Sequence, residues 1–524
     1  MMKKQLLVSF FLLSFLHPVL AQITPAIDWQ KCLGGTGNEA AFSVEQTSDG
    51  GYISAGYSDS NDGDVSGNHG SNDYWVMKLD ANSNLEWQKS LGGSSIDQAN
   101  SVKQTIDGGF VVAGYTYSTN DDVTGNHGSS DYWVVKLGTA GDLIWQKTLG
   151  GSSDDGANSI QQTDDGGFIV AGYSSSNNDD VSGNHGMWDY WIVKLDSSGN
   201  LTWQKSLGGT NNDVAYFIQQ TDDGGYVISG YSESNDGDVA GNNGARDYWI
   251  VRLDTGGELV WQTHLGSSGY DEAFGVQQTS DGFLVAGFAG SNDFDVSGNH
   301  GGYDYWIVKL DSSGSMLSQT CFGGTNTDQA FSLNQTTGGG FVVAGQSLST
   351  NGDVTGNHGG YDFWIVKIDA DATLEWQKSL GGSSDDYGPY NIQQTIDGGF
   401  ILGGASLSND DDVSGNHGGA FYGDCWIVKL AGGKATGISS PVNYLFSVYP
   451  NPAQDELNIE SLQPLNDVSV HVFDVAGKMI ALPILFDGTR LQLKTSALAD
   501  GIYSLLVVNL KTNEEGVLKF VKSE

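Results

Sequence analysis

Short apolar stretches separated by polar loops recur from Ile27 to Leu430 with a period of about 58 residues. One stretch reads D-Y-W-[IV]-V-K-L, and its Trp column is Trp75, Trp133, Trp191, Trp249, Trp306, Trp364 and Trp426. A second reads W-Q-K-x-L-G-G, and its column is Trp29, Trp87, Trp145, Trp203, Trp261, Ser318 and Trp376. Repeats of this length are typical of stacked units that bury their faces against their neighbours.

Within one repeat the pattern predicts four antiparallel strands. In the third copy these strands are 143–149, 159–163, 168–173 and 189–195, with a tight turn at Asp165-Gly166-Gly167. No stretch has the 3.6-residue apolar period of a helix. Four short strands per repeat are typical of a propeller blade, and strands that are apolar on both faces fit a blade packed between two others. A stacked β-helix is the alternative, but its coils are usually shorter.

The ends of the repeat array predict a closed ring. The array starts with an isolated W-Q-K strand, 27–33, and its last copy lacks that strand after Leu430. Docking the first strand onto the last blade gives seven complete blades and no open sheet edge at the seam. We therefore predict an all-β protein with a seven-bladed propeller over residues 27–430.

The register of the predicted strands indicates which cysteines lie opposite each other. If the hairpin between the third and fourth strands is centred on Asn82, Tyr74 pairs with Ser90, and the same columns bring Cys425 opposite Cys32. We therefore predict a Cys32–Cys425 disulfide at the seam, with Cys321 left as a free thiol. A slip of one residue would put the two cysteines on opposite faces, and three unrelated buried thiols are the alternative.

Both ends of the chain differ from the repeats. Residues 1–21 have the basic start, short apolar core and small-residue cleavage site of a signal peptide. No later segment is long and apolar enough to span a membrane. Residues 431–440 form a Gly- and Ser-rich linker, and the alternating pattern of residues 441–524 predicts a small β-sandwich.

Residues 441–524 also carry Y-P-N-P at Tyr449-Pro450-Asn451-Pro452, D-x-x-G-K ending at Lys478, and D-G-x-Y at Asp500, Gly501 and Tyr503. In this order at a C-terminus, these motifs resemble the type A C-terminal sorting domain of the type IX secretion system of Bacteroidota. The repeats resemble the propeller-type regions found in front of such domains. The resemblance implies that the type IX machinery is a partner. It also implies export across the outer membrane, removal of the domain, and release or attachment to the outer cell surface.

The charge balance narrows the choice of ligand. The chain has 23 basic and 63 acidic residues, a net charge of −40. Nucleic acids and anionic membrane surfaces need a basic face, so neither is expected as a partner. The charge favours cations as partners, or simply high solubility, and we expect a monomer.

The loop before D-Y-W has the spacing of a calcium-binding loop, with oxygen donors at positions 1, 3, 5 and 12 and Gly at position 6. The candidate calcium ligands are Asp62, Asp64, Ser66 and Asp73; Asn120, Asp122, Thr124 and Asp131; Asn178, Asp180, Ser182 and Asp189; Asp293, Asp295, Ser297 and Asp304; and Asn351, Asp353, Thr355 and Asp362. Against calcium, position 12 is Asp rather than Glu, and Ala240 replaces the hydroxyl in the fourth copy. The alternative is that these side chains close the loop by bonding its backbone.

Six of these loops contain His in N-H-G, for which we expect a packing or turn role rather than one shared metal site. The six are His69, His127, His185, His300, His358 and His417. Thirteen of the fourteen Trp residues lie in the two repeat columns, which indicates packing between blades. The aromatic side chains predicted to contact a ligand are Trp188, Tyr303, Tyr361 and Phe421.

Strand direction places the G-G-S-S-D-D loops and the D-V-S-G-N-H-G loops on one face. We expect an acidic rim there, formed in part by Asp97, Asp155, Asp213, Asp271, Asp328 and Asp386. No nucleophile or metalloprotease motif is present, and seven similar loops favour binding over catalysis. The sequence thus favours a secreted or surface-attached, non-enzymatic binding or adhesion propeller for a polysaccharide or protein, with calcium as the candidate cofactor. A polysaccharide hydrolase or lyase using carboxylates of the acidic face is the alternative.

Overall fold

The computed structural model describes residues 24–418 and 423–432. In the C-terminal part it describes residues 446–449, 453–461, 468–473, 479–480, 484–487, 490–496, 498–499, 501–509 and 515–522. The expected signal peptide, 1–21, and most of the expected linker lie outside the described residues. Contacts divide the chain into two compact units, Met1–Lys434 and Ala435–Glu524.

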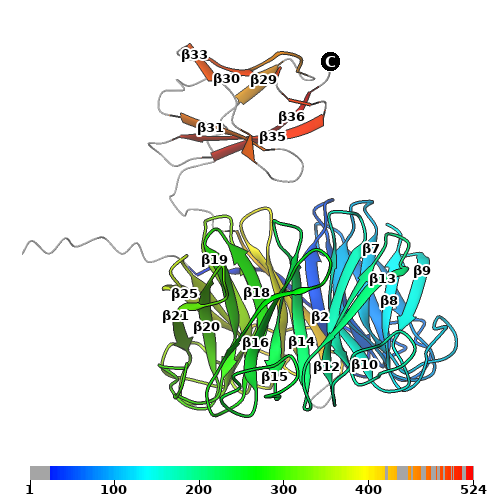
Figure 1. Ribbon diagram of the computed structural model, residues 1–524. Helices are drawn as coiled ribbons and strands as arrows, with labels where there is room; N and C mark the ends of the chain where they lie inside the picture. The colour runs from blue at the N-terminus through cyan, green and yellow to red at the C-terminus, as the bar shows by residue number, and fades with distance from the viewer. Residues whose placement is uncertain are drawn as a thin grey trace, which may run out of the picture. The chain divides into compact units, whose positions relative to one another are not determined.

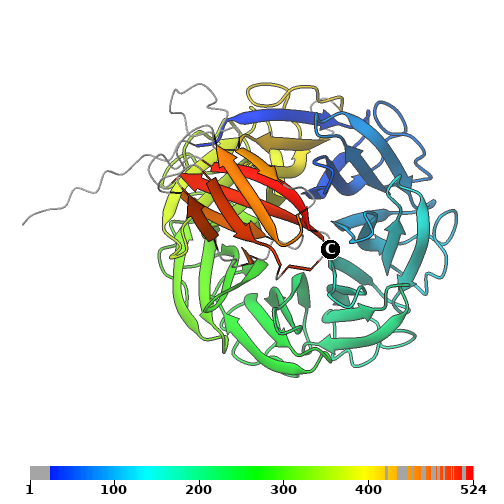
Figure 2. The ribbon, with the colours of Figure 1, turned by 90° about the horizontal axis from the view of Figure 1, so that it is seen from above.

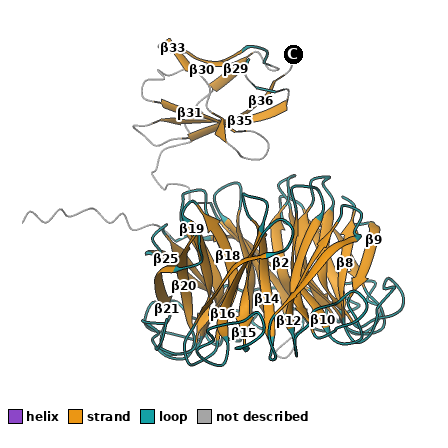
Figure 3. Ribbon diagram, viewed as in Figure 1, coloured by secondary structure: helices purple, strands orange, loops and turns teal. Residues whose placement is uncertain are grey.

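The first unit is a seven-bladed β-propeller, as predicted (Figures 1 and 2). Each blade is an antiparallel four-stranded sheet, and strands and loops account for all of its described residues (Figure 3). Blade 1 contains β2 (Glu39–Gln46), β3 (Tyr52–Ser58), β4 (Asp73–Leu79) and β5 (Leu85–Leu91). Blade 2 contains β6 (Asp97–Gln104), β7 (Phe110–Thr116), β8 (Asp131–Leu137) and β9 (Leu143–Leu149). Blade 3 contains β10 (Asp155–Gln162), β11 (Phe168–Ser174), β12 (Asp189–Leu195) and β13 (Leu201–Leu207).

The remaining blades follow the same order. Blade 4 contains β14 (Asp213–Gln220), β15 (Tyr226–Ser232), β16 (Asp247–Leu253) and β17 (Leu259–Leu265). Blade 5 contains β18 (Asp271–Thr279), β19 (Gly282–Ala289), β20 (Asp304–Asp311) and β21 (Met316–Phe322). Blade 6 contains β22 (Asp328–Gln335), β23 (Phe341–Ser347), β24 (Asp362–Ile368) and β25 (Leu374–Leu380). Blade 7 contains β26 (Asp386–Gln394), β27 (Phe400–Ser406), β28 (Asp424–Leu430) and β1 (Ile27–Leu33).

The ring is closed by the first strand of the propeller. β1 pairs with β28, so residues nearly 400 positions apart complete one sheet. The Trp426 indole N–H donates to Gln30 Oε1 at 2.9 Å across this seam. The same Trp-to-Gln bond occurs within the other six blades, for example from Trp133 to Gln146 at 2.8 Å. The seam therefore reproduces the bonding of an uninterrupted blade.

The predicted disulfide at this seam is wrong. Cys32 lies opposite Trp426, and Cys425 lies opposite Leu33. Cys32 packs in the core shared with blade 6 and Cys425 in the core shared with blade 1, so the two thiols lie on opposite faces of the sheet. Cys32, Cys425 and Cys321 are all buried and free. In each blade a bulge next to the hairpin turn, at Glu86 in blade 1, shifts the remaining pairs by one residue.

The D-Y-W motif forms the contact between blades. Its seven Trp side chains are fully buried, as the regular Trp columns predicted. The Tyr74 ring packs against the Trp133 ring of the next blade at 4.5 Å between centroids, and its hydroxyl donates to Trp133 O at 2.8 Å. Gly114 gives this hydroxyl its space, because a Cβ there would lie 2.7 Å from Tyr74 Oη. The A-G-Y and D-Y-W motifs therefore depend on each other at this junction, and Tyr132, Tyr190 and Tyr248 repeat both contacts. Phe363 in blade 6 and Cys425 in blade 7 have no hydroxyl at this position.

The C-terminal unit consists of two four-stranded sheets. One sheet contains β29 (Phe446–Tyr449), β30 (Glu456–Ser461), β34 (Arg490–Lys494) and β33 (Ile484–Asp487). The other contains β32 (Met479–Ile480), β31 (Val468–Phe473), β35 (Gly501–Asn509) and β36 (Glu515–Lys522). Leu457 and Leu493 from the first sheet share one buried cluster with Val472 and Leu505 from the second. This shared core is that of the predicted small β-sandwich.

Candidate ligand-binding site

Two sets of loops meet on one face of the propeller, as strand direction predicted. We call this the loop face. The loop before β2 donates its backbone N–H groups to the loop after β3, with Thr36 N to Asp62 Oδ1 at 2.8 Å and Gly37 N to Ser60 Oγ at 2.8 Å. Corresponding bonds recur in blades 2 to 7. The loop face is thus built from interlocked pairs of loops.

The candidate calcium ligands are bonded to protein donors. In the first copy, position 1 (Asp62) accepts from Thr36, and position 3 (Asp64) accepts from Gly34 N at 3.3 Å. Position 5 (Ser66) accepts from the Gln88 amide at 2.6 Å, the same Gln that binds the buried Trp75 indole. The other copies repeat this bonding. This is the bonding expected if the side chains close the loop.

Position 12 is bonded to the loop histidine. Asp73 Oδ2 accepts from His69 N at 2.8 Å and lies 2.7 Å from His69 Nδ1. All six histidines of the N-H-G loops make this contact, at 2.6 to 2.7 Å. Asp73 is fully buried and its other oxygen, Oδ1, has no hydrogen-bond partner. In each of the six blades that has a loop histidine, this histidine therefore stabilises the buried carboxylate at position 12.

Calcium binding by these loops stays a prediction. Among the described residues, no three His, Cys, Asp or Glu side chains gather as a metal-ligand set. Because the loop oxygens already accept hydrogen bonds, we expect EDTA to leave the Tm unchanged within about 1 °C, as measured by differential scanning fluorimetry. A Tm that rises by several degrees with added calcium and falls with EDTA would instead establish a calcium site.

The first residues of the inner strands do not form the acidic rim that we predicted. Asp97, Asp155, Asp213, Asp271, Asp328 and Asp386 are fully buried. Asp97 accepts from Gly93 N at 2.8 Å and from Ser118 Oγ at 2.8 Å, and its counterparts are bonded in similar ways. Burial raises the pKa of Asp155 to about 6 despite these bonds. The exposed acidic residues of the loop face lie further along the loops, as at Asp62 and Asp121.

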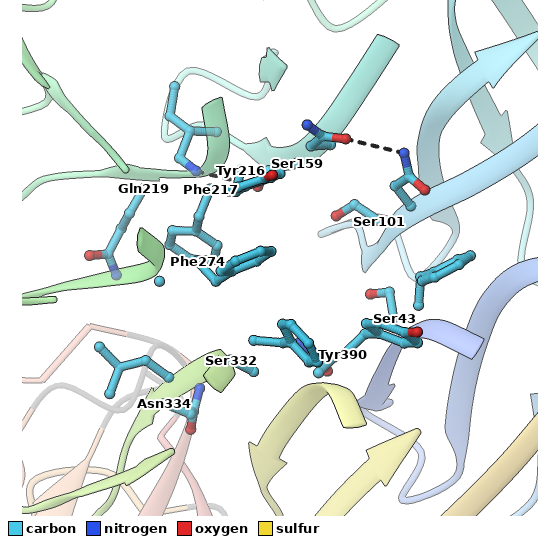
Figure 4. A pocket seen from close by; sticks show the side chains of 18 of the residues that line it. Ser43, Ser101, Ser159, Tyr216, Phe217, Gln219, Phe274, Ser332, Asn334 and Tyr390 are labelled. Carbon is cyan, nitrogen blue, oxygen red and sulfur yellow. Dashed lines mark hydrogen bonds between the residues drawn. The ribbon is translucent and has the colours of Figure 1, made fainter. Parts of the chain in front are cut away.

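The inner strands surround a chamber of about 500 Å³ in the central channel (Figure 4). In the first six blades one residue is bulged out of the pairing between the first two strands, as at Phe42 in blade 1. In blade 7 the irregular stretch of β26 spans residues 388–390, and Tyr390 holds the corresponding position. This column lines the chamber and reads Phe42, Asn100, Asn158, Tyr216, Phe274, Phe331 and Tyr390. It holds aromatic rings in five blades and asparagine in the other two.

Five consecutive blades, 4 to 7 and 1, supply aromatic rings that touch in sequence. We call these residues the aromatic arc: Tyr216, Phe274, Phe331, Tyr390 and Phe42. The successive centroid distances are 4.1, 5.2, 5.4 and 4.8 Å. Each ring is partly exposed. The arc is a continuous apolar wall on one side of the chamber.

Blades 2 and 3 supply the asparagine pair, Asn100 and Asn158, on the other side. Asn100 Nδ2 donates to Ala157 O at 2.8 Å and lies 3.3 Å from Asn158 Oδ1, which fixes both amides. Figure 4 shows Phe274 and Tyr390 facing the hollow across from Ser101 and Ser159. The chamber thus has one aromatic side and one amide and hydroxyl side.

The predicted ligand-contacting aromatics that the structure describes, Trp188, Tyr303 and Tyr361, directly precede the D-Y-W strands on the loop face. The Trp188 ring packs on Tyr173 at 4.8 Å, and the Tyr361 ring lies 5.9 Å from that of Tyr387. Tyr303 lines a pocket of about 290 Å³ that shares Phe274 and Phe331 with the chamber wall. Phe421 lies outside the described residues. Ligand contact by these side chains stays a prediction.

Arg246 organises this smaller pocket. Its guanidinium donates to Glu233 Oε1 at 2.8 Å and to Glu272 Oε1 at 2.6 Å, and it lies 4.4 Å from the centroid of the Tyr231 ring. Tyr216 of the aromatic arc donates its hydroxyl to Glu272 Oε2 at 3.0 Å. Glu233 and Glu272 therefore both bind the Arg246 guanidinium. The bond from Tyr216 to Glu272 connects this smaller pocket to the chamber.

Residues 447–522 match the secretion system C-terminal sorting domain. The C-terminal unit is therefore a sorting domain of the type IX secretion system, and the propeller is cargo that this machinery exports to the cell surface or the medium. Within the described part of the chain, no helix has the length and apolar character needed to cross a membrane. Tyr503 of the sorting motif is buried and its hydroxyl donates to Ala499 O at 2.9 Å. Pro450, Asn451, Pro452, Asp500 and the side chain of Tyr449 lie outside the described residues.

The other similar proteins have low sequence identity to this chain. A curated relative, the regulatory protein FlaEY of Caulobacter vibrioides, is 24% identical over 157 residues, which span 27% of this chain and 16% of that protein. Among solved structures, PorZ, a surface component of the type IX secretion system of Porphyromonas gingivalis, aligns over 94% of this chain and 60% of its own, at 13% identity and a TM-score of 0.40. Puromycin hydrolase aligns over 84% and 62%, at 10% identity and a TM-score of 0.43. At this level of similarity neither structure bears on the function of this chain.

Proposed function

We propose that the exported propeller is a non-enzymatic binding protein with one ligand site at the channel opening of the loop face. This proposal rests on which sequence positions differ between the seven repeats. The D-Y-W strands that pack between blades are almost identical, whereas the columns that border the channel change from blade to blade. The residue before D-Y-W is Asn72, Ser130, Trp188, Arg246, Tyr303, Tyr361 and Gly423 in the seven blades.

The differences in the columns that border the channel support one asymmetric site in place of seven equal ones. A single ligand contacts several blades at once only near the axis, where the inner strands converge (Figure 2). Pockets of this kind are lined by aromatic side chains with a few fixed polar groups, as found in the chamber and in the Arg246 pocket. Glu233 and Glu272, the acidic pair of that pocket, both bind Arg246, which favours binding over carboxylate catalysis.

Glycan and protein arrays with the mature chain, residues 22–524, test this proposal, with turnover assays on the same polysaccharides. We expect binding without turnover, and we expect Trp188→Ala or Tyr303→Ala to weaken it. Leu317→Ala, on the outer strand β21 where the side chain is exposed, is the matched control and should bind normally. Turnover that one Asp or Glu substitution abolishes would replace the proposal with a hydrolase or lyase.

A further inference from the structure

We propose that the ligand of the channel chamber is a neutral saccharide, whose ring lies between the aromatic arc and the asparagine pair. This inference rests on the proposed function and assigns its ligand class. The chamber, at about 500 Å³, is within the size range of small-molecule sites. It is partly open to solvent, because every residue of the arc and the pair is partly exposed.

The two-sided wall matches the two-sided surface of a sugar ring. A pyranose has C–H groups on its faces and hydroxyl groups around its edge. The aromatic arc supplies an unbroken surface of four ring-to-ring contacts for the C–H groups. An amide oxygen accepts two hydrogen bonds, and Asn100 Oδ1 accepts one from Gln98 at 3.0 Å, so it has a lone pair for a hydroxyl.

The charges of the chamber exclude an anionic ligand. Lys103 is the one charged residue among those lining it, and its ammonium group lies 3.2 Å from Glu45 Oε2. At the loop face, Arg246 is held by two carboxylates. A uronate or sulfate would therefore meet no uncompensated cation here, while the net charge of −40 repels it.

Rigidity supports recognition of a ring by this chamber. Tyr216 stacks on Phe274 with the two planes 9° apart, and its hydroxyl is tied to Glu272. Asn158 is fixed by its bond to Ala215 O at 2.8 Å. Because these groups are already ordered, little conformational entropy is lost when a ligand binds them.

Isothermal titration of the mature chain with neutral hexasaccharides tests the inference; the probes are cello-, laminari-, xylo- and mannohexaose. Hexagalacturonate and sulfated carrageenan oligosaccharides are the anionic probes. We expect at least one neutral hexasaccharide to bind and both anionic sets to fail. Phe331→Ala should raise the Kd about tenfold. Ile106→Ala, an exposed apolar residue at a turn of the opposite face, is the matched control and should leave the Kd unchanged.

Phe331→Leu separates the aromatic ring from apolar volume, and it keeps the inference testable if the alanine variant folds poorly. It should also weaken binding several-fold with an unchanged Tm. The inference is overturned if no neutral hexasaccharide binds, or if binding is the same in both Phe331 variants. Binding of an anionic glycan or a protein, unaffected by these variants, would overturn the saccharide assignment and leave the proposed binding function standing. Cleavage of a bound saccharide would contradict the proposed function instead.

Discussion

Deletion of residues 22–33 is expected to abolish cooperative unfolding of the propeller. β1 is the fourth strand of blade 7, so its loss exposes the pairing edge of β28 and one side of the buried Trp426. It also removes Gln30, the acceptor of the Trp426 indole. We expect the variant to lose most of the roughly 5–15 kcal/mol that stabilises a typical domain.

Circular dichroism melting and binding of a hydrophobic dye measure this effect. The parent chain should melt in one sharp transition without dye binding, and the deletion variant should bind dye at room temperature. Asp28→Ala is the control, because this side chain of β1 is exposed and its loss leaves the pairing of the strand intact. A deletion variant that melts sharply within about 5 °C of the parent would show that the ring does not need its first strand.

The second large effect is an increase in stability on acidification from pH 8 to about pH 5. Burial raises the pKa of Asp247 to about 7 and that of five other fully buried carboxyl groups to about 6. Those five are Asp155, Asp213, Asp271, Asp304 and Asp386. Burial alone would lower the pKa of His69, but the hydrogen bond and charge of Asp73 raise it overall.

The direction of this change in stability follows from proton uptake. A group whose pKa is higher in the folded state than in the unfolded chain binds more protons when folded, so its contribution is full at low pH and is lost as the pH rises through the folded value. The fold therefore loses stability as the pH rises from 5 to 8 and these groups lose their protons. Below about pH 4 the trend reverses. The pKa of Asp165, lowered to about 2 by the bonds from Thr163 and Lys194, gives a contribution that protonation removes.

Differential scanning calorimetry across pH 3–8 measures the effect, and we expect the Tm at pH 5 to exceed that at pH 8 by roughly 5 °C or more. Asp247→Asn should raise the Tm at pH 8 and change it little at pH 5, because an amide keeps the acceptor for the Asn243 N–H and carries no charge. Asp164→Asn, in an exposed turn, is the control and should change neither value. A Tm that is constant from pH 5 to pH 8 would contradict the raised pKa values.

The arrangement of strands could be predicted from the sequence because the signal was repeated seven times. The D-Y-W and W-Q-K columns marked the strands, and the missing fourth strand after Leu430 marked the closure. The register of the outer hairpin could not be predicted. A bulge at Glu86, like that at Asp28 in the seam, adds one residue without changing the repeat length. That single residue is why Cys32 and Cys425 lie on opposite faces.

The chamber was not predicted, although the sequence contains a varying column of residues that indicates it. The fourth residue of [DE]-x-A-x-S is Phe42, Asn100 and Asn158 in three successive blades, a change of chemistry inside an otherwise regular strand. The bulge turns this residue toward the axis, which a strict two-residue alternation does not reveal. Similarly, the carboxylate of Asp97 was assigned to the rim because Asp is usually exposed. In the structure, serine hydroxyl and backbone N–H donors make its burial possible.

The pairing of β1 with β28 also constrains the order of folding. β1 leaves the ribosome first, yet its hydrogen-bonding partner is the last strand made before the C-terminal unit. Blade 7 is therefore incomplete until the last strand of the propeller has been synthesised. Because this contact spans nearly the whole propeller in sequence, final assembly has a high loop-closure cost and is expected to be the slow step. The native ring can form only once Asp424–Leu430 is available to pair with β1.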